Sequence, residues 1–162
     1  VIYDAATDQF TGPKPEGLPV MLGYQASGAA PFLRGAPVEL PETVATAIRI
    51  GNPQSWHHAK AVVRDSNGWF DELTDTEILE AQRLLSMYEG VFVEPASAAS
   101  LGGAIRDIKA GKIAEGSVIV CTVTGNGLKD PDSAIKQCSD AVMLTIDATM
   151  SEVKSSILAN MD

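Results

Sequence analysis

The sequence has few of the residues that build metal sites or disulfide frameworks. Its 162 residues include two cysteines and two histidines. His57 and His58 are adjacent, so on a helix they point in different directions, and no cysteine or carboxylate stands at metal-ligand spacing from them. Cys121 lies in an apolar run, where a buried and inert thiol is expected. These features exclude a disulfide scaffold, and we predict no metal site.

Basic residues are also scarce. The sequence holds 12 Lys and Arg against 21 Asp and Glu, which gives a net charge of −9 at pH 7, and it contains no basic run. Such an acidic chain repels phosphate backbones and anionic lipid. Neither nucleic acid nor a membrane surface is therefore an expected partner.

Long hydrophobic runs are missing as well. No apolar stretch is long enough to span a bilayer, and the residues after Val1 lack the basic and apolar regions of a secretory signal. We therefore predict a cytoplasmic protein. The chain does not begin with Met, which indicates either processing or origin from a longer polypeptide.

What is present is an alternation of strand patterns with helical patterns. The expected strands cover residues 19–26, 69–72, 91–94, 117–124 and 142–146, with a brief edge element at 37–39. The expected helices cover residues 54–64, 75–89, 98–110, 132–137 and 150–161. Their lengths are those of βαβ units, which predicts an α/β fold with a mostly parallel sheet flanked by helices.

The same pattern divides the chain into three parts. Residues 1–18 are predicted to be an irregular lead-in or linker, because prolines and glycines interrupt them. Residues 19–147 form the α/β body, and residues 148–162 contain the C-terminal helix. Within the body, Thr74 followed by Glu77 predicts a capping box at the start of the clearest helix.

Two predicted strands end in residues that carry chemistry. Glu94 ends an apolar strand and precedes Pro95, and a carboxylate there is costly unless it is paired or functional. The alternative is that Glu94 caps the following helix or accepts hydrogen bonds from exposed amides. Thr124 ends the next strand, and the Gly-Asn-Gly run at 125–127 lets backbone approach a ligand closely. The alternative there is an ordinary turn, and the spacing matches neither a Walker loop nor a dinucleotide fingerprint.

A third candidate is Arg49, which stands between Ile48 and Ile50. Apolar neighbours on both sides indicate a partly buried guanidinium, which usually has a carboxylate or phosphate partner. The alternative is a solvated side chain at the edge of a loop. No Gly-x-Ser-x-Gly motif is present, so a hydrolase triad has no support.

Four segments, in the same order, resemble the threonine synthase family. They are residues 25–31 (QASGAAP), 46–56 (TAIRIGNPQSW), 89–100 (EGVFVEPASAAS) and 121–131 (CTVTGNGLKDP). The resemblance implies a pyridoxal-phosphate enzyme of the tryptophan-synthase-β type, also called fold-type II. It further implies a lyase that converts O-phospho-L-homoserine and water to L-threonine and phosphate, by γ-elimination of phosphate and addition of water at Cβ.

The resemblance also implies which residues face the cofactor. Thr124 matches the serine or threonine whose hydroxyl is hydrogen bonded to the pyridine nitrogen, and a neutral hydroxyl leaves that nitrogen largely unprotonated. Glu94 matches a carboxylate beside the cofactor ring, and Arg49 either faces the substrate or is structural. The backbone that flanks the ring and the floor near Thr124 are matched by Ile50, Gly51, Gly125 and Asn126.

Two parts of the family's active site precede the matched segments. One is the lysine that forms an imine with the cofactor, and the other is the Gly- and Asn-rich loop that holds its phosphate. We therefore predict that this chain is the C-terminal part of such an enzyme, inactive without the N-terminal part, and the resemblance implies a homodimer. Two alternatives stay open: a related enzyme of this fold such as cysteate synthase, and a non-catalytic binding or regulatory domain.

Overall fold

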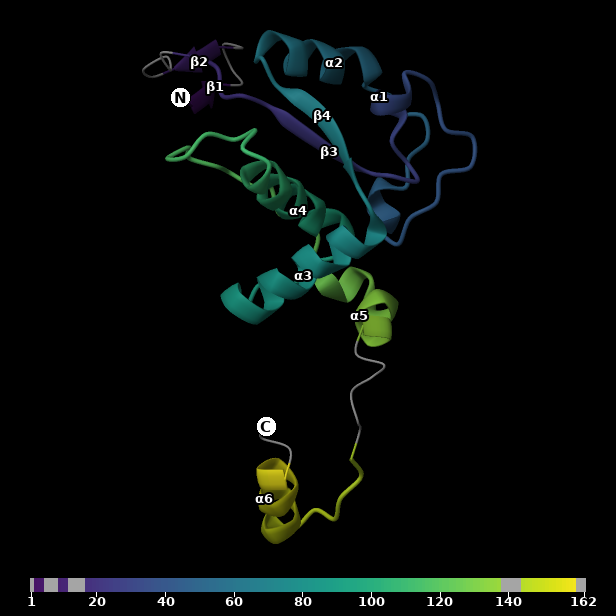
Figure 1. Cartoon of the computed structure of the whole chain (residues 1–162), viewed down its shortest axis with the longest axis vertical. Helices are drawn as coiled ribbons and strands as arrows, with labels where there is room; N and C mark the ends of the chain where they lie inside the picture. Colours follow the sequence, from purple (N-terminus) through teal and green to yellow (C-terminus); the bar gives the residue numbers. More distant parts are fainter. Residues whose placement is uncertain (1, 5–8, 12–16, 138–143, 160–162) are drawn as a thin grey trace. The chain divides into compact units, whose positions relative to one another are not determined.

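The computed structural model describes residues 2–4, 9–11, 17–137 and 144–159 (Figure 1). The chain forms two compact units, Val1–Lys129 and Asp130–Asp162. The first unit holds the sheet and the candidate site. Within the described part of the second unit, α5 (Pro131–Gln137) and α6 (Met150–Ala159) are the helices, as the sequence predicts.

A pair of parallel strands forms the centre of the first unit. Strand β3 (Leu22–Ala26) pairs with β4 (Trp69–Leu73) in a register that sets Leu22 opposite Trp69 and Ala26 opposite Leu73. Parallel strands need a long crossover, and here it contains α2 (Trp56–Asp65). The crossover also contains α1 (Pro31–Arg34) and the 3-10 helix η1 (Thr46–Ile48). Parallel strands with helices on their faces confirm the predicted α/β class.

Helix α3 (Asp75–Glu89) has the bounds and the cap that the sequence predicts. The Thr74 backbone N–H donates to Glu77 Oε2 at 2.7 Å, and the Glu77 N–H donates to Thr74 Oγ1 at 3.3 Å. These two bonds form the capping box. At the other end Gly90 has φ = 66°, a left-handed conformation that glycine adopts without strain.

Helix α4 (Pro95–Lys109) packs against α3 and against one face of the strand pair, and α2 lies across the other face (Figure 1). Small residues allow this close contact, since a Cβ on Gly103 would lie 2.3 Å from the ring of Tyr24. The apolar core under α4 contains the buried side chains of Ala26, Ala45, Leu73, Ile78 and Ala99. Tyr24, Ile48 and Ala96 pack against this core, so η1 and the start of α4 share it.

Several predicted elements are wrong or differ in their bounds. Residues 91–94 and 117–124 were expected as buried strands, but neither forms one, and a single bridge between Val93 and Asn126 remains. Val118 is 94% exposed and Val120 is 88% exposed. A strand exists only where a neighbour takes its hydrogen bonds, and the described residues offer these two segments none beyond that bridge.

Smaller differences concern the ends of elements. Helix α4 begins at Pro95, three positions earlier than predicted, because proline is well suited to a first helical turn. The edge element at 37–39 does not form, and residues 144–146 are irregular, while 142–143 lie outside the described residues. Within the predicted lead-in, β1 (Ile2–Asp4) pairs antiparallel with β2 (Gln9–Thr11).

Candidate functional site

The structure brings the two predicted strand-end motifs together at the start of α4. The Glu94 backbone N–H donates to the carbonyl oxygen of Gly125 at 3.0 Å, and the Gly127 N–H donates to that of Phe92 at 3.2 Å. Glycine is required at both positions of the loop. A Cβ on Gly125 would lie 1.9 Å from Glu94 Oε1, and one on Gly127 would lie 2.4 Å from the Phe92 ring.

Glu94 is 7% exposed, and it occupies the N-cap position of α4. Its side chain accepts no hydrogen bond from the first turn of that helix, so the capping alternative drawn from the sequence is not what the structure shows. Among the described residues, no hydrogen bond or ion pair to this carboxylate is formed. The residue is largely buried, but its carboxylate oxygens still reach solvent, so they are accessible to a ligand.

Ser97 is a member of this site that the sequence analysis missed. Its side chain is 2% exposed, and its Oγ accepts the backbone N–H groups of Thr124 at 3.1 Å and Gly125 at 2.7 Å. The same Oγ lies 2.9 Å from Thr124 Oγ1. The prediction began the helix at Ala98, which left Ser97 in a turn. A small polar residue two positions after the proline of a helix start was the signal available.

Thr124 and Asn126 have different surroundings. The side chain of Thr124 is exposed, so its hydroxyl is accessible to a ligand. Asn126 Oδ1 instead accepts the Leu128 backbone N–H at 2.9 Å, which is the local bond of an Asx turn. The Asn126 side chain therefore shapes the turn into the 3-10 helix η2 (Gly127–Lys129). Lys129 is exposed at the end of that helix.

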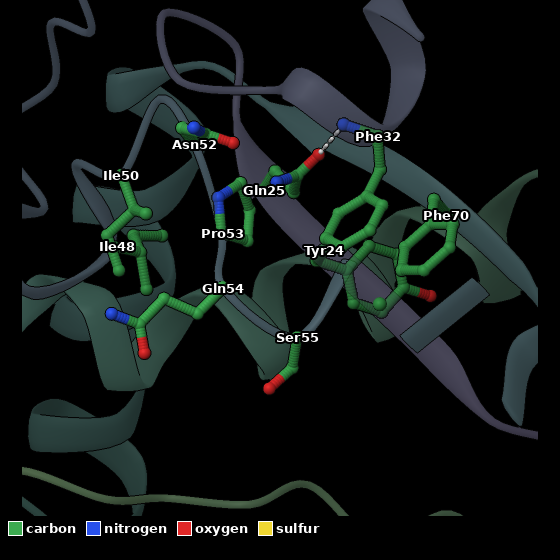
Figure 2. A pocket seen from close by; sticks show the side chains of 11 residues that line it. Tyr24, Gln25, Phe32, Ile48, Ile50, Asn52, Pro53, Gln54, Ser55 and Phe70 are labelled. Atoms are coloured by element: carbon green, nitrogen blue, oxygen red, sulfur yellow. Dashed lines mark hydrogen bonds between the residues drawn. The ribbon is translucent and has the colours of Figure 1, made fainter. Parts of the chain in front are cut away.

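Ile50 lies at the wall of a pocket of about 680 Å³ (Figure 2). The walls come from β3, β4, α1 and the loop after η1, with stacked rings of Phe32 and Phe70 whose centroids are 4.3 Å apart. Gln25 Oε1 points to the start of α1 and accepts the Phe32 N–H at 3.0 Å. Glu94 and Thr124 do not line this pocket. Of the predicted cofactor residues, Ile50 is the one that lines this pocket.

Gly51 and Arg49 flank Ile50 on the same loop. The Val38 N–H donates to the Gly51 carbonyl at 2.9 Å, and a Cβ on Gly51 would lie 1.9 Å from the Val38 carbonyl oxygen. Only glycine fits this close approach. The Arg49 side chain is about half exposed, and its nearest acidic group is Glu42 at 4.0 Å. This arrangement is closer to the solvated alternative than to a buried guanidinium.

A second buried carboxylate lies at the far end of α4. Asp107 is fully buried, and its Oδ2 accepts hydrogen bonds of 2.7 Å from both the Tyr24 hydroxyl and Trp69 Nε1. Burial raises the pKa of Tyr24 above its usual value, and the bond to Asp107 adds to this. Lys112 Nζ lies 3.5 Å from Asp107 Oδ1. These bonds tie both strands of the sheet to α4.

The charged groups around Asp107 also shift one another's pKa values. Partial burial opposes the charge of Asp71, yet the hydrogen bonds from Lys112 and the Glu72 amide hold the pKa of Asp71 below its usual value. The same Asp71–Lys112 bond, 2.8 Å long, raises the pKa of Lys112. Arg106 Nη2 lies 2.8 Å from Asp71 Oδ2. This cluster is a connected ionic network, unlike the surroundings of Glu94.

Other candidates from the sequence have no comparable surroundings. In the described part of the chain, no group of three or more potential ligand side chains could hold a metal ion. His57 and His58 are exposed on α2. Cys121 is partly buried, and burial raises the pKa of its thiol.

Among the described residues, no helix is both long and apolar enough to cross a membrane.

A sequence model of the family described as pyridoxal-phosphate dependent enzyme matches residues 8–125. The chain belongs to this family, and membership implies pyridoxal 5′-phosphate as its cofactor. The structure of maize serine racemase is similar in fold, with a TM-score of 0.54 and 22% identity over 75% of this chain and 39% of that one. A structure of an O-ureido-L-serine synthase variant has a TM-score of 0.52 at 17% identity, over 85% and 38% of the two chains.

Within the family, the chain is similar to threonine synthases. It is 55% identical to that of Mycobacterium leprae over 81% of this chain and 36% of the relative. It is 53% identical to that of Synechocystis over 80% and 33%, and 44% identical to that of Methanocaldococcus jannaschii over 80% and 34%. The chain thus spans about a third of the length of these relatives.

The residues at the start of α4 fit one side of the family's cofactor. A pyridine ring presents a nitrogen and two apolar faces, and the site offers the exposed hydroxyl of Thr124 beside a buried, unpaired carboxylate of Glu94. The glycines at 125 and 127 keep the loop close to Glu94 and Phe92. The described site holds no matching group for a phosphate.

Proposed function

We propose that this chain is the C-terminal part of a threonine synthase, which converts O-phospho-L-homoserine and water to L-threonine and phosphate. The observation that carries the proposal is the junction of Thr124 and Gly125 with Glu94 at the start of α4, in a chain 53–55% identical to threonine synthases. The similarity covers both segments of that junction.

In the proposed site each residue has a separate task. Thr124 is hydrogen bonded to the ring nitrogen, and Glu94 lies beside the ring. Ile50 and Gly51 bring backbone against a face of the ring, while Gly125 and Asn126 form the floor near Thr124. Arg49 is placed toward the substrate on the resemblance alone, since its side chain is half exposed here. When bound, pyridoxal 5′-phosphate supplies the electron sink.

We further propose that activity requires the N-terminal part of the enzyme. The matched region makes up only 33–36% of these relatives, which leaves room for the imine lysine and the phosphate loop outside it. The exposed apolar residues Val118 and Val120 support this, because a β-branched run is stable in water only when another segment covers it. A homodimer, which the resemblance implies, stays a prediction.

The test compares the chain alone with a complemented protein. We define the complemented protein as this chain joined to the part of the Mycobacterium leprae threonine synthase that precedes its matched region. Each is incubated with pyridoxal 5′-phosphate and reduced with borohydride, and the modified lysine is located by mass spectrometry. The expected result is a reduced imine in the complemented protein, on a lysine outside this chain, and none on the chain's seven lysines.

Turnover of the complemented protein identifies the substrate. Phosphate release from O-phospho-L-homoserine, with threonine as product, supports the proposal. Phosphoserine with sulfite tests the cysteate synthase alternative in the same assay. A reduced imine on any lysine of this chain would contradict the division of the active site between the two parts.

A further inference from the structure

The hydrogen bonds of Ser97 fix the direction in which its hydroxyl donates. Its Oγ accepts two backbone N–H groups, from Thr124 at 3.1 Å and Gly125 at 2.7 Å. A serine oxygen has two acceptor lone pairs and one hydrogen. An amide N–H can only donate, so both lone pairs of Ser97 are occupied.

Ser97 Oγ therefore donates its single hydrogen to one of its two remaining neighbours. They are Thr124 Oγ1 at 2.9 Å and the Gly125 carbonyl oxygen at 3.2 Å. If Thr124 donated to Ser97 instead, Ser97 would need a third lone pair. Thr124 Oγ1 is the nearer of the two acceptors for this hydrogen, and with either acceptor the hydrogen of Thr124 points away from Ser97.

The outward hydrogen of Thr124 faces the accessible side of the site. The Thr124 side chain is exposed, and within the part of the chain that the structure describes its Oγ1 is hydrogen bonded to Ser97 alone. Accepting a hydrogen bond polarises a hydroxyl, which makes it a stronger donor and leaves it one lone pair fewer to accept with.

We infer that Ser97 is a positioning residue that makes Thr124 a hydrogen-bond donor toward its ligand, so that this place favours an unprotonated ring nitrogen. The inference rests on the proposed function only in naming the ring nitrogen as the ligand atom. It adds a role for a buried serine that touches neither cofactor nor substrate in the proposed site. Ser97 sets both the position of the Thr124–Gly125 backbone and the direction of the Thr124 hydrogen.

The first experiment needs no variant and no cofactor. NMR of the labelled 162-residue chain is expected to show a slowly exchanging hydroxyl hydrogen on Ser97, because this side chain is 2% exposed and donates inside the protein. The Thr124 hydroxyl hydrogen is expected to exchange with water too fast to be seen. A protected Thr124 hydroxyl hydrogen with contacts to Ser97 would overturn the inference.

The second experiment measures amide hydrogen exchange in Ser97→Ala and Ser100→Ala. Ser100 is the matched control on the same helix, since its Oγ donates to the carbonyls of Ser97 and Thr122. Loss of the acceptor in Ser97→Ala is expected to speed exchange of the Thr124 and Gly125 amides by about tenfold. Ser100→Ala should leave both rates within about twofold. Equal rates in the two variants would contradict the positioning role.

The third experiment uses the complemented protein with pyridoxal 5′-phosphate labelled with nitrogen-15 in the ring. The ring signal is expected at the unprotonated position at neutral pH, and to move toward the protonated position in Ser97→Ala. Thr124→Val tests the proposed function separately, because it removes the donor itself. If Thr124→Val leaves the ring signal unchanged, the proposed ring contact fails, while the first two experiments still decide the role of Ser97. An unshifted signal in Ser97→Ala alone counts against Ser97.

Discussion

The two ends of α4 each carry a buried carboxylate, and the two carboxylates have opposite surroundings. Asp107, near the C-terminal end, is hydrogen bonded to Tyr24 and Trp69 and lies beside Lys112. Glu94, at the N-terminal end, has no partner for its carboxylate among the described residues. Removing one partner from a buried charged cluster is strongly destabilising, whereas a carboxylate without a protein partner is available to a ligand. The comparison separates a structural end from a functional end on one helix.

The largest expected effect is the loss of the Asp107 carboxylate. Asp107→Ala leaves the Tyr24 hydroxyl and Trp69 Nε1 without their acceptor and the nearby cations without their counter-charge. We expect the free energy of unfolding to fall by about 3–5 kcal/mol. Urea unfolding followed by tryptophan fluorescence measures this. Glu80→Ala, which breaks an exposed pair with Arg83, is the control and should barely move the midpoint.

A smaller effect, on activity instead of stability, is expected at the other end. Thr124→Ala removes the proposed hydrogen bond to the ring nitrogen, so turnover of the complemented protein should fall about tenfold, which equals about 1.4 kcal/mol. Its unfolding midpoint should stay near that of the parent, because the Thr124 side chain is exposed. Phosphate release measures turnover, and Thr124→Ser is the control that keeps the hydroxyl. Full activity in Thr124→Ala would break the assignment of this end as functional.

Unlike Asp107→Ala, Glu94→Gln is not expected to lower the free energy of unfolding. Removing a buried charge that has no partner should leave the free energy of unfolding unchanged or raise it by up to about 1 kcal/mol. Turnover of the complemented protein should fall in the same variant, because the carboxylate beside the ring is lost. Urea unfolding and phosphate release together test this. A clear loss of stability would mean that Glu94 is a structural carboxylate like Asp107.

The smallest effect is the pH dependence of the network around Asp107. The pKa of Asp71 is lowered in the folded chain, so its contribution is present above the unfolded value of 3.8 and is lost as pH falls through the folded pKa. Asp71→Asn should therefore flatten the acid limb of stability below about pH 4. The raised pKa values of Lys112 and Tyr24 act at the alkaline limb, where stability is lost above about pH 10. Urea midpoints measured at successive pH values provide the test, and an unchanged acid limb in Asp71→Asn would count against the network.

Local signals in the sequence were sufficient for much of the helical structure. The capping box of Thr74 and Glu77 and the glycine at position 90 place both ends of α3 without reference to any other element. The runs at 91–94 and 117–124 are equally apolar, yet the strand prediction fails for both. A strand depends on hydrogen bonds to a neighbour, and a sequence pattern carries no information on whether that neighbour is present.

The candidate site shows the same limit. Thr124, Gly125 and Glu94 were found from strand ends and from the resemblance, and the structure brings these three together. Ser97 was missed because the helix was predicted to begin one residue after it, and Asp107 because an aspartate in a helical stretch has no distinctive pattern. Their importance comes from partners that lie 27 and 83 residues away along the chain.

The sequence by itself determined the α/β class, the bounds of α3, the acidic charge and the residues that resemble threonine synthase. Only the tertiary structure decided that Asp107 Oδ2 accepts two hydrogen bonds, whereas the Glu94 carboxylate accepts none among the described residues. It also placed Ile50 at the wall of a pocket and the buried Ser97 hydroxyl within hydrogen-bond distance of Thr124 Oγ1. The physical reason is that caps and periodic faces depend on neighbours within a few residues. Burial and hydrogen-bond partners depend on which distant segments the fold brings into contact.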